Sequence, residues 1–289
     1  MNPRLVWDVW RRILTNEDLV ATVLAGDLTR LDPQLSPEER AVLEDYASTP
    51  EATRITIGMY RNRTQSVARS SLGMVAPHSK RLLERTGADR ATALTREYTV
   101  ASGYRDDGPR FCKTALDFLG FLAGVPPFTE APGWADILAL ETASVRLQQR
   151  LGDDRAWRAP PACDPAFDRE AGETFLDYDA WALVWCGNAE TARLEHDVTP
   201  WLEDPAALGE AAVGPGPTWW IASLADTTSE IAYAQISERA FDVYAVLAQP
   251  LRPAEVGARA PALSEDDVLS ILGELLDLGV IRAIPAIPA

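Results

Sequence analysis

The sequence predicts an α+β protein in which an all-helical N-terminal domain precedes a small winged-helix-like domain with short antiparallel strands. Apolar residues recur at helical spacing through the first half, the period changes to two near residue 181, and helical spacing returns near residue 238. The chain has 289 residues, of which 47% are hydrophobic and 24% charged, so it is globular in composition and longer than one usual domain. We therefore expect a helical domain over 1–155, a linker over 156–178 and a second domain over 179–289.

Helix signals follow one another from the N-terminus. The first helix is predicted from apolar residues at helical spacing, namely Leu5, Val6, Val9, Trp10 and Ile13. Asn16 is placed to cap a second helix, and Ser36 begins a capping box that Glu39 completes, with a proline in the first turn. The other helices of this domain are expected over 52–75, 89–101, 111–123 and 134–151.

The second half begins after a segment without either period. Residues 152–177 are rich in Asp, Pro and Gly, which indicates a linker. Strands at 181–185 and 191–198 are expected to form a hairpin through a tight turn at Gly187–Asn188. A second hairpin is expected from strands at 218–224 and 230–236. Three helices should close the chain, over 238–248, 253–259 and 264–278.

The charge distribution bears on the class of partner. The formal net charge is −16, which disfavours binding to phosphates. Between Arg54 and Lys113, however, 12 basic residues face 5 acidic ones, giving +7 and leaving −23 for the rest of the chain. The helix expected over 264–278 carries five carboxylates and no basic residue, so it would be repelled by DNA. The alternative that stays open is a DNA-binding regulator that uses the basic N-terminal helices.

The sequence lacks the features that would indicate a membrane protein, a disulfide-rich protein or a common class of enzyme. No stretch approaches the ~18 apolar residues of a membrane span, and three scattered cysteines form no disulfide framework, so we expect a cytoplasmic protein. The sequence has two histidines and none of the common phosphate-loop, nucleotide or metalloprotease motifs. His196 and Asp197 are neighbours on an expected strand and should point to opposite faces. We expect no catalytic residue, metal or cofactor in this chain.

A family resemblance runs through most of the sequence. Tyr60-Arg61-Asn62 lies in a segment, Ile57–Leu83, that resembles the Y-R-N box of the HvfC-like family, once described as DNA-binding proteins. Further matches are Phe118–Leu122 before Pro126–Pro127, Trp134–Glu141, Arg193–Leu194, Thr218–Trp220 and Leu275–Ile281. Two features depart from the family pattern: Arg63 stands where a second Asn is usual, and the C-terminal strands are not rich in Arg.

The resemblance implies a function that the residues alone do not. Members of this family are similar to MbnC-type helper subunits, which form a heterodimer with a multinuclear non-haem iron-dependent oxidase. Their C-terminal module, comparable to a recognition element of ribosomal peptide biosynthesis, binds the leader of a precursor peptide. The resemblance therefore implies a non-catalytic chain whose partners are an oxidase, which holds the iron, and a ribosomal precursor peptide.

Two candidate sites follow from this implication. A short sheet beside an apolar helix can accept an extended peptide as a further strand, so we expect a peptide site at Trp219, Trp220, Ile221, Leu224, Val268, Ile271 and Leu275. The alternative is that these side chains are simply core. The basic stretch is the expected docking surface for the partner enzyme, through Arg54, Tyr60, Arg61, Asn62, Arg63 and Arg69. The alternatives here are a solvated helix face and, for Tyr60-Arg61-Asn62, buried polar groups that join one helix to its neighbours.

Overall fold

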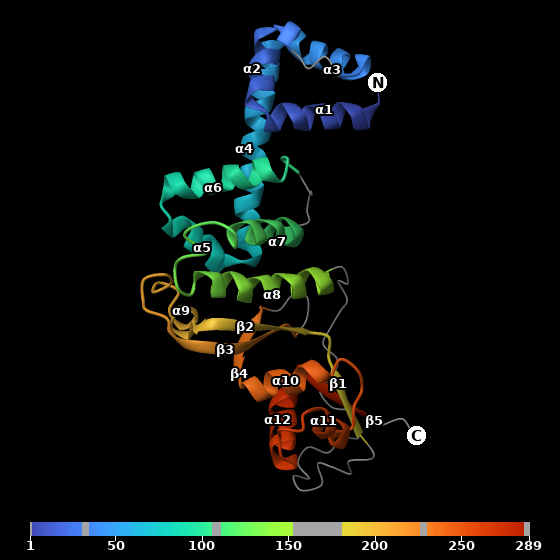
Figure 1. The fold of residues 1–289 in the computed structure, drawn as a ribbon, viewed down its shortest axis with the longest axis vertical. Coiled ribbons are helices and arrows are strands. Elements are labelled where there is room, and N and C mark those ends of the chain that lie inside the picture. The colour runs from blue at the N-terminus through green and yellow to red at the C-terminus, as the bar shows by residue number, and fades with distance from the viewer. Residues whose placement is uncertain (1, 31–34, 106–110, 153–180, 226–229, 286–289) are drawn as a thin grey trace. The chain divides into compact units, whose positions relative to one another are not determined.

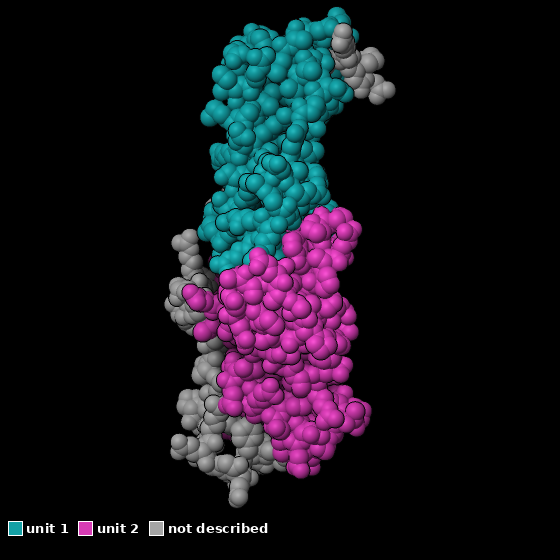
Figure 2. Space-filling model, turned by 90° about the vertical axis from the view of Figure 1, so that its left-hand side faces the viewer, with its two compact units in different colours: residues 1–125 teal, residues 126–289 magenta. Residues whose placement is uncertain are grey.

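The structure is a computed structural model that describes residues 2–30, 35–105, 111–152, 181–225 and 230–285. The α+β class is confirmed: a helical N-terminal region precedes a region with small antiparallel sheets (Figure 1). The chain divides into two compact units, Met1–Val125 and Pro126–Ala289 (Figure 2). The sequence pattern predicts this boundary near residue 155, and the expected linker over 156–178 lies outside the described residues.

Helices build the first unit. They are α1 (Pro3–Thr15), α2 (Glu17–Ala25), α3 (Pro37–Ser48), α4 (Pro50–Val75), α5 (Pro77–Arg85), α6 (Ala88–Ala101) and α7 (Phe111–Leu122), with a 3-10 turn η1 (Leu28–Arg30). The caps act as the sequence predicted, because Asn16 accepts from the Leu19 amide and the Ser36–Glu39 capping box is complete. The helix α5 was not predicted; Pro77 ends α4 and also begins α5, where a proline lacks only an N–H that needs no partner.

Two groups of contacts hold α4 in the first unit. Ile57 joins the apolar core that α1, α2 and α3 form around Trp10, Ile13 and Leu14. Further along, Ala68 and Leu72 are buried, and α5, α6 and α7 pack against this part of α4. The long helix α4 therefore runs through the whole first unit, and its remaining face is exposed at the surface.

The second unit begins with a long helix and ends with a strand. Its elements are α8 (Trp134–Gly152), β1 (Trp181–Trp185), β2 (Ala189–Asp197), α9 (Thr199–Glu203), β3 (Gly214–Ser223), β4 (Ala232–Ile236), α10 (Glu238–Val246), α11 (Pro253–Arg259), α12 (Glu265–Asp277) and β5 (Ile281–Pro285). The helix α8 lies along β2 and β3, where Leu147 and Leu151 pack with Leu224 (Figure 1). By these contacts α8 belongs with the sheet rather than with the helices that precede it.

Strand pairing differs in part from the prediction. The expected hairpin of β3 and β4 is confirmed, with Ile221 opposite Ala234. The expected hairpin of β1 and β2 is wrong, because β1 pairs with β5 and β2 pairs with β3. Gly187 has a positive φ of 78°, as the turn prediction required, but the turn directs the chain from one sheet to the other.

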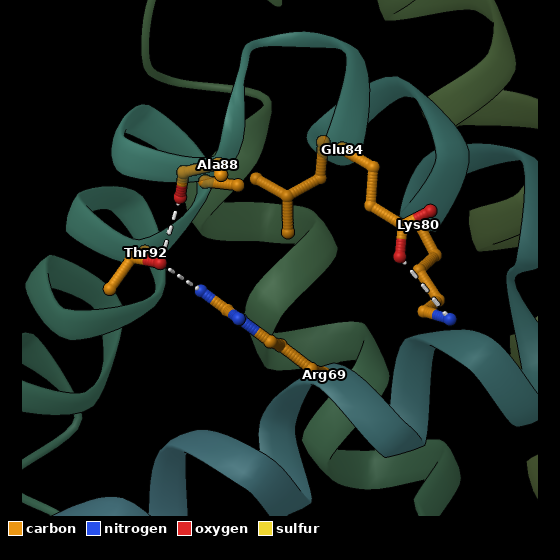
Figure 3. A pocket seen from close by; sticks show the side chains of 7 residues that line it. Arg69, Lys80, Glu84, Ala88 and Thr92 are labelled. Atoms are coloured by element: carbon orange, nitrogen blue, oxygen red, sulfur yellow. Dashed lines mark hydrogen bonds and ion pairs between the residues drawn. The ribbon is translucent and has the colours of Figure 1, made fainter.

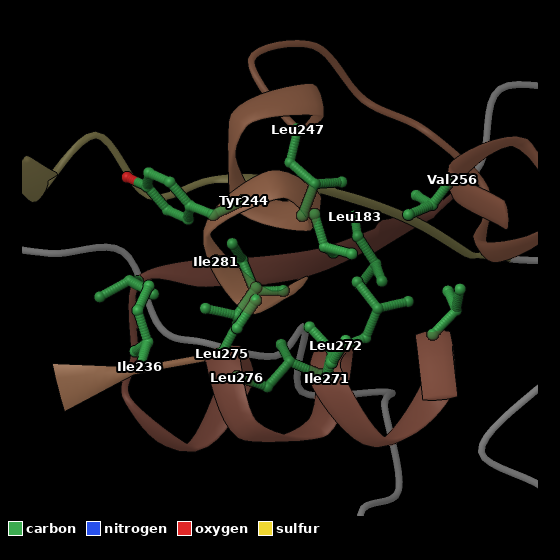
Figure 4. Packing of buried hydrophobic residues seen from close by; sticks show 14 of the residues in the cluster. Leu183, Ile236, Tyr244, Leu247, Val256, Ile271, Leu272, Leu275, Leu276 and Ile281 are labelled. Atoms are coloured by element: carbon green, nitrogen blue, oxygen red, sulfur yellow. The ribbon is translucent and has the colours of Figure 1, made fainter. Parts of the chain in front are cut away.

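The C-terminal helices share one core with both sheets. The stripe of α12 packs against β1, β3, β4, β5, α10 and α11 (Figure 4). Trp185 stacks on Tyr244 with ring centroids 5.1 Å apart, and its indole N–H donates to the Tyr244 carbonyl at 2.6 Å. The small module is thus held by one apolar core and one aromatic pair. No described helix is long and apolar enough to cross a membrane.

Candidate functional site

The six expected docking residues all lie on α4 but do not share one face. Arg54 is exposed and pairs with Glu51 at 2.9 Å, one turn before it. Arg63 is exposed on another side of the helix, since nine residues separate the two by two and a half turns. A single basic docking face made from these side chains is therefore excluded by the helix geometry.

Arg61 is an internal clamp. Its Nε and Nη2 both donate to the Leu14 carbonyl, at 3.2 and 2.7 Å, near the end of α1. Its Nη1 pairs with Glu17 at 3.0 Å, and the guanidinium lies 5.8 Å from the centroid of the Tyr104 ring. The docking role expected for Arg61 is thus replaced by a structural one, which was the alternative for this motif. Tyr60 also joins α4 to α1, because its ring packs edge-on against Trp10 with ring centroids 6.1 Å apart.

Asn62 and Arg69 line a surface cleft between α4, α5 and α6. The cleft consists of two adjoining cavities of about 260 and 400 Å³, and Arg69, Lys80 and Thr92 line both. Asn62 is exposed in the second cavity, so the alternative that it is a buried polar group is wrong for this residue. Figure 3 shows Arg69 extending from α4 toward Thr92 on α6.

The electrostatics of this cleft are set by two cations and one anion. Lys80 pairs with Glu84 at 3.3 Å, one turn along α5. Arg69 donates from Nε to the Thr95 hydroxyl at 3.1 Å and from Nη2 to the Thr92 hydroxyl at 2.8 Å. The cleft is therefore net positive by one charge among its lining residues.

The expected peptide site on β3 is wrong as an edge. Trp219, Trp220 and Ile221 pair with β2 on one side and with β4 on the other. Trp220 and Ile221 are buried and Trp219 packs against the C-terminal core, while Leu224 packs on α8. A central strand has no free main-chain groups to offer a peptide. The alternative, that these aromatic and aliphatic side chains are core, fits the structure.

The expected peptide residues on α12 are also core. Val268, Ile271 and Leu275 are at most 7% exposed and face Leu183, Tyr244 and Ile281 (Figure 4). These three side chains could contact a ligand only if this core opened. The apolar stripe on α12 identified the buried face of this helix correctly. That face packs against other segments of the same chain, so it is not available to a peptide.

A free strand edge lies on β4. Among the described residues, β4 pairs with β3 alone, and its sequence is Ala232-Tyr233-Ala234-Gln235-Ile236. Ile236 and Ala234 pack on the C-terminal core, and Tyr233 lies against α8. Burial, and next the nearby Glu141 carboxylate, raise the pKa of the Tyr233 hydroxyl above its usual range, whereas a hydrogen bond with Ser144 acts in the opposite direction.

A buried carboxylate that contacts a histidine was missed from the sequence. Asp136 on α8 accepts from the Glu195 amide at 2.7 Å and contacts His196 Nδ1 at 2.8 Å. Asp197, the sequence neighbour of His196, instead accepts from the Thr199 amide at 2.9 Å. The register shifts between Leu194 and His196, so Asp136 serves the amide that this bulge removes from the ladder. No local signal could have found it, since 60 positions separate the partners.

A metal site is not apparent in the described parts of the chain, where no three His, Cys, Asp or Glu side chains are grouped to hold an ion. Comparison with protein-family models and with curated proteins finds no match.

The geometry defines two candidate binding sites, the cleft beside α4 and the free edge of β4, each within one compact unit.

Proposed function

We propose that this protein is a non-catalytic accessory subunit for a multinuclear non-haem iron-dependent oxidase. It binds the leader of a ribosomal precursor peptide as an added strand on β4 and presents the peptide to the oxidase, which the first unit holds. The resemblance to HvfC-like helper proteins suggested both partners. The observation that carries the peptide site is the edge of β4, which no segment within the described residues covers.

The outer edges of β2 and β1 are protected, each by a different device. On β2, Arg150 donates to the carbonyls of Gly187 and Ala189, both at 3.1 Å, and Asp136 occupies the Glu195 amide. The second edge of β1 bonds to Leu251, whose carbonyl accepts from the Leu183 amide at 2.7 Å. Charges, bulges and covering segments of this kind prevent strand addition.

The edges of β5 and β4 differ in the residues that they carry. In the described residues each pairs with one strand, but β5 carries Arg282 and β4 carries no charge, proline or bulge. Both faces of β4 are supported, by α8 and by the C-terminal core, so a peptide would meet a rigid template. Strand addition supplies main-chain hydrogen bonds, and an affinity near 1 μM, about −8 kcal/mol, would permit release after modification.

The DNA-binding alternative receives less support from the first unit. It requires free cations on the N-terminal helices, whereas many arginines there are paired with carboxylates. These pairs are Arg12–Glu39, Arg54–Glu51, Arg61–Glu17, Arg90–Glu97 and Arg96–Glu17. A DNA reader would also lose affinity steeply with salt, whereas strand addition would not.

The test combines calorimetry and complex formation. A synthetic leader, encoded beside the gene for this chain, should bind the full protein, and Gln235→Lys should weaken binding on the order of 10-fold by placing a charge on the edge. The control is Glu230→Lys, a larger charge change at an exposed position just before β4, which should leave affinity within about twofold. The oxidase encoded nearby should co-purify with both variants.

The outcomes separate the parts of the proposal. Equal weakening by both variants would reject the strand edge in favour of general electrostatics. Binding of neither the leader nor the oxidase would refute the function as a whole. Salt-sensitive binding of duplex DNA in their place would establish the regulator alternative.

A further inference from the structure

Arg69 differs from the paired arginines of the first unit. Its two described hydrogen bonds go to the neutral hydroxyls of Thr92 and Thr95, and no carboxylate in the described residues lies within ion-pair distance. The side chain is only partly exposed. A guanidinium has five N–H donors, so three remain beyond these two bonds. A partly desolvated cation gains most from an anion that is supplied from outside.

The cavities beside Arg69 offer further donors to such an anion. Lys80 carries three N–H donors and shares one with Glu84. The wider cavity is also lined by four uncharged polar side chains, for which the described residues offer no hydrogen-bond partner: Asn62, Gln65, Ser66 and Ser70. Figure 3 shows the two cations and Glu84 around the narrower cavity.

Glu84 determines which anion suits the cleft. It lies in the same lining as Arg69 and Lys80, so the local charge is +1 rather than +2. A carboxylate with one negative charge neutralises this lining, whereas a phosphate near two charges would leave about one negative charge uncompensated. Arg also forms paired hydrogen bonds with a planar carboxylate.

The surface of α4 around the cleft favours a protein ligand over a small molecule. Ile55, Met59 and Met74 are 54%, 69% and 61% exposed, although large apolar side chains on a solvated helix face are usually few. Positions 55, 59, 62, 66, 70 and 74 recur every three or four residues, so the apolar residues and the cleft share one face. From Ile55 to Met74 this face extends over about 29 Å at 1.5 Å per residue.

Charge completes the description of the partner. The only acidic residue of α4 is Glu51, in its first turn, whereas Arg69 of α4 and the neighbouring Lys80 line the cleft. Gly58 has open space around its missing Cβ, so packing within the chain does not require a glycine there. A helix-interior glycine costs roughly 1 kcal/mol relative to alanine and permits another chain to approach closely.

We infer that the cleft beside α4 binds an acidic amphipathic segment of a partner protein. One carboxylate of that segment binds Arg69 and Lys80, and its apolar side chains lie on Ile55, Met59 and Met74. This inference rests on the proposed function only for the identity of the partner, since it specifies the surface by which the first unit holds the oxidase. The site and its ligand chemistry follow from the first unit alone.

The test uses the full-length protein and two fluorescein-labelled peptides. One peptide has Leu and Glu at amphipathic helical spacing, and the other has Gln in place of every Glu. Fluorescence anisotropy should show binding of the acidic peptide and binding on the order of 10-fold weaker for the Gln peptide. Arg69→Gln should weaken the acidic peptide by a similar factor, whereas Arg54→Gln, at an exposed and already paired position, should change it less than about twofold.

Two further variants keep the result independent of folding. Ser66→Trp fills the wider cavity from an exposed position and leaves Arg69 intact, so it should also block the acidic peptide. Met59→Ser removes an apolar contact and should weaken both peptides. Equal affinity of wild type and Arg69→Gln would overturn the inference, as would displacement of the peptide by inorganic phosphate together with no effect of Met59→Ser.

The leader-binding assay distinguishes this inference from the proposed function. Leader affinity depends on β4 and should be unchanged in Arg69→Gln. Leader binding without acidic-peptide binding would refute the cleft alone. Acidic-peptide binding without leader binding would refute the strand-edge site and leave the cleft supported.

Discussion

Replacing Arg61 with alanine should loosen the attachment of α4 to α1. The substitution removes two N–H donors from the Leu14 carbonyl, an ion pair with Glu17 and a cation over the Tyr104 ring. Charged hydrogen bonds contribute about 1.5–3 kcal/mol, and the Glu17 pair adds less than about 1 kcal/mol because Glu17 is 59% exposed. The expected local loss is about 3 kcal/mol, which corresponds to on the order of 100-fold in an opening equilibrium.

Hydrogen–deuterium exchange measures this loss where it occurs. Amides of α1 and of the middle of α4 should exchange on the order of 100-fold faster in Arg61→Ala, while the C-terminal helices keep their rates. Arg61→Lys should recover only part of the protection, because an ammonium lacks the planar fork that serves one carbonyl twice. The matched control, Arg54→Ala, removes only an exposed pair one turn apart. Wild-type exchange in Arg61→Ala would refute the clamp.

The remaining predictions concern three carboxylates, those of Asp136, Glu39 and Asp267. Asp136→Ala should destabilise the second unit by about 3 kcal/mol, because it leaves the bulge amide and His196 without their acceptor; unchanged exchange in β2 would contradict this. Hydrogen bonds from the Ser36 backbone lower the pKa of Glu39, and hydrogen bonds from Ser264, its side chain first, lower the pKa of Asp267. A lowered pKa stabilises the helix above the ordinary carboxyl value of about 4, and this contribution is lost as the pH falls further. Circular dichroism should show that helix content falls as the pH drops below about 4, and this fall should be smaller in Glu39→Gln.

The leader and acidic-peptide assays address different surfaces and need not agree. The strand-edge site depends on main-chain groups of β4, so it should tolerate salt and respond to Gln235→Lys. The cleft depends on Arg69, so it should weaken with salt and respond to Arg69→Gln. Measuring both peptides on both variants gives a direct check that the two sites are independent.

The sequence by itself determined the local structure. Helical period, capping boxes and prolines placed most helices, because these signals act over three or four neighbouring residues. Alternation placed the strands at 181–185, 218–224 and 230–236 close to β1, β3 and β4. The apolar stripe of α12 also identified its buried face, since a helix packs by the side that carries its apolar residues.

The tertiary structure alone decided which elements meet. A strand pattern does not name its partner, so β1 with β5 and the central place of β3 could not be read from alternation. Arginines of one helix received different roles from contacts far along the chain: Arg61 meets Leu14 across 47 positions, and Arg69 meets Thr95 across 26. The sequence specifies short-range order through local propensity. Within the described parts of the chain, the free edge of β4 and the absence of a carboxylate partner for Arg69 result from the packing of distant segments.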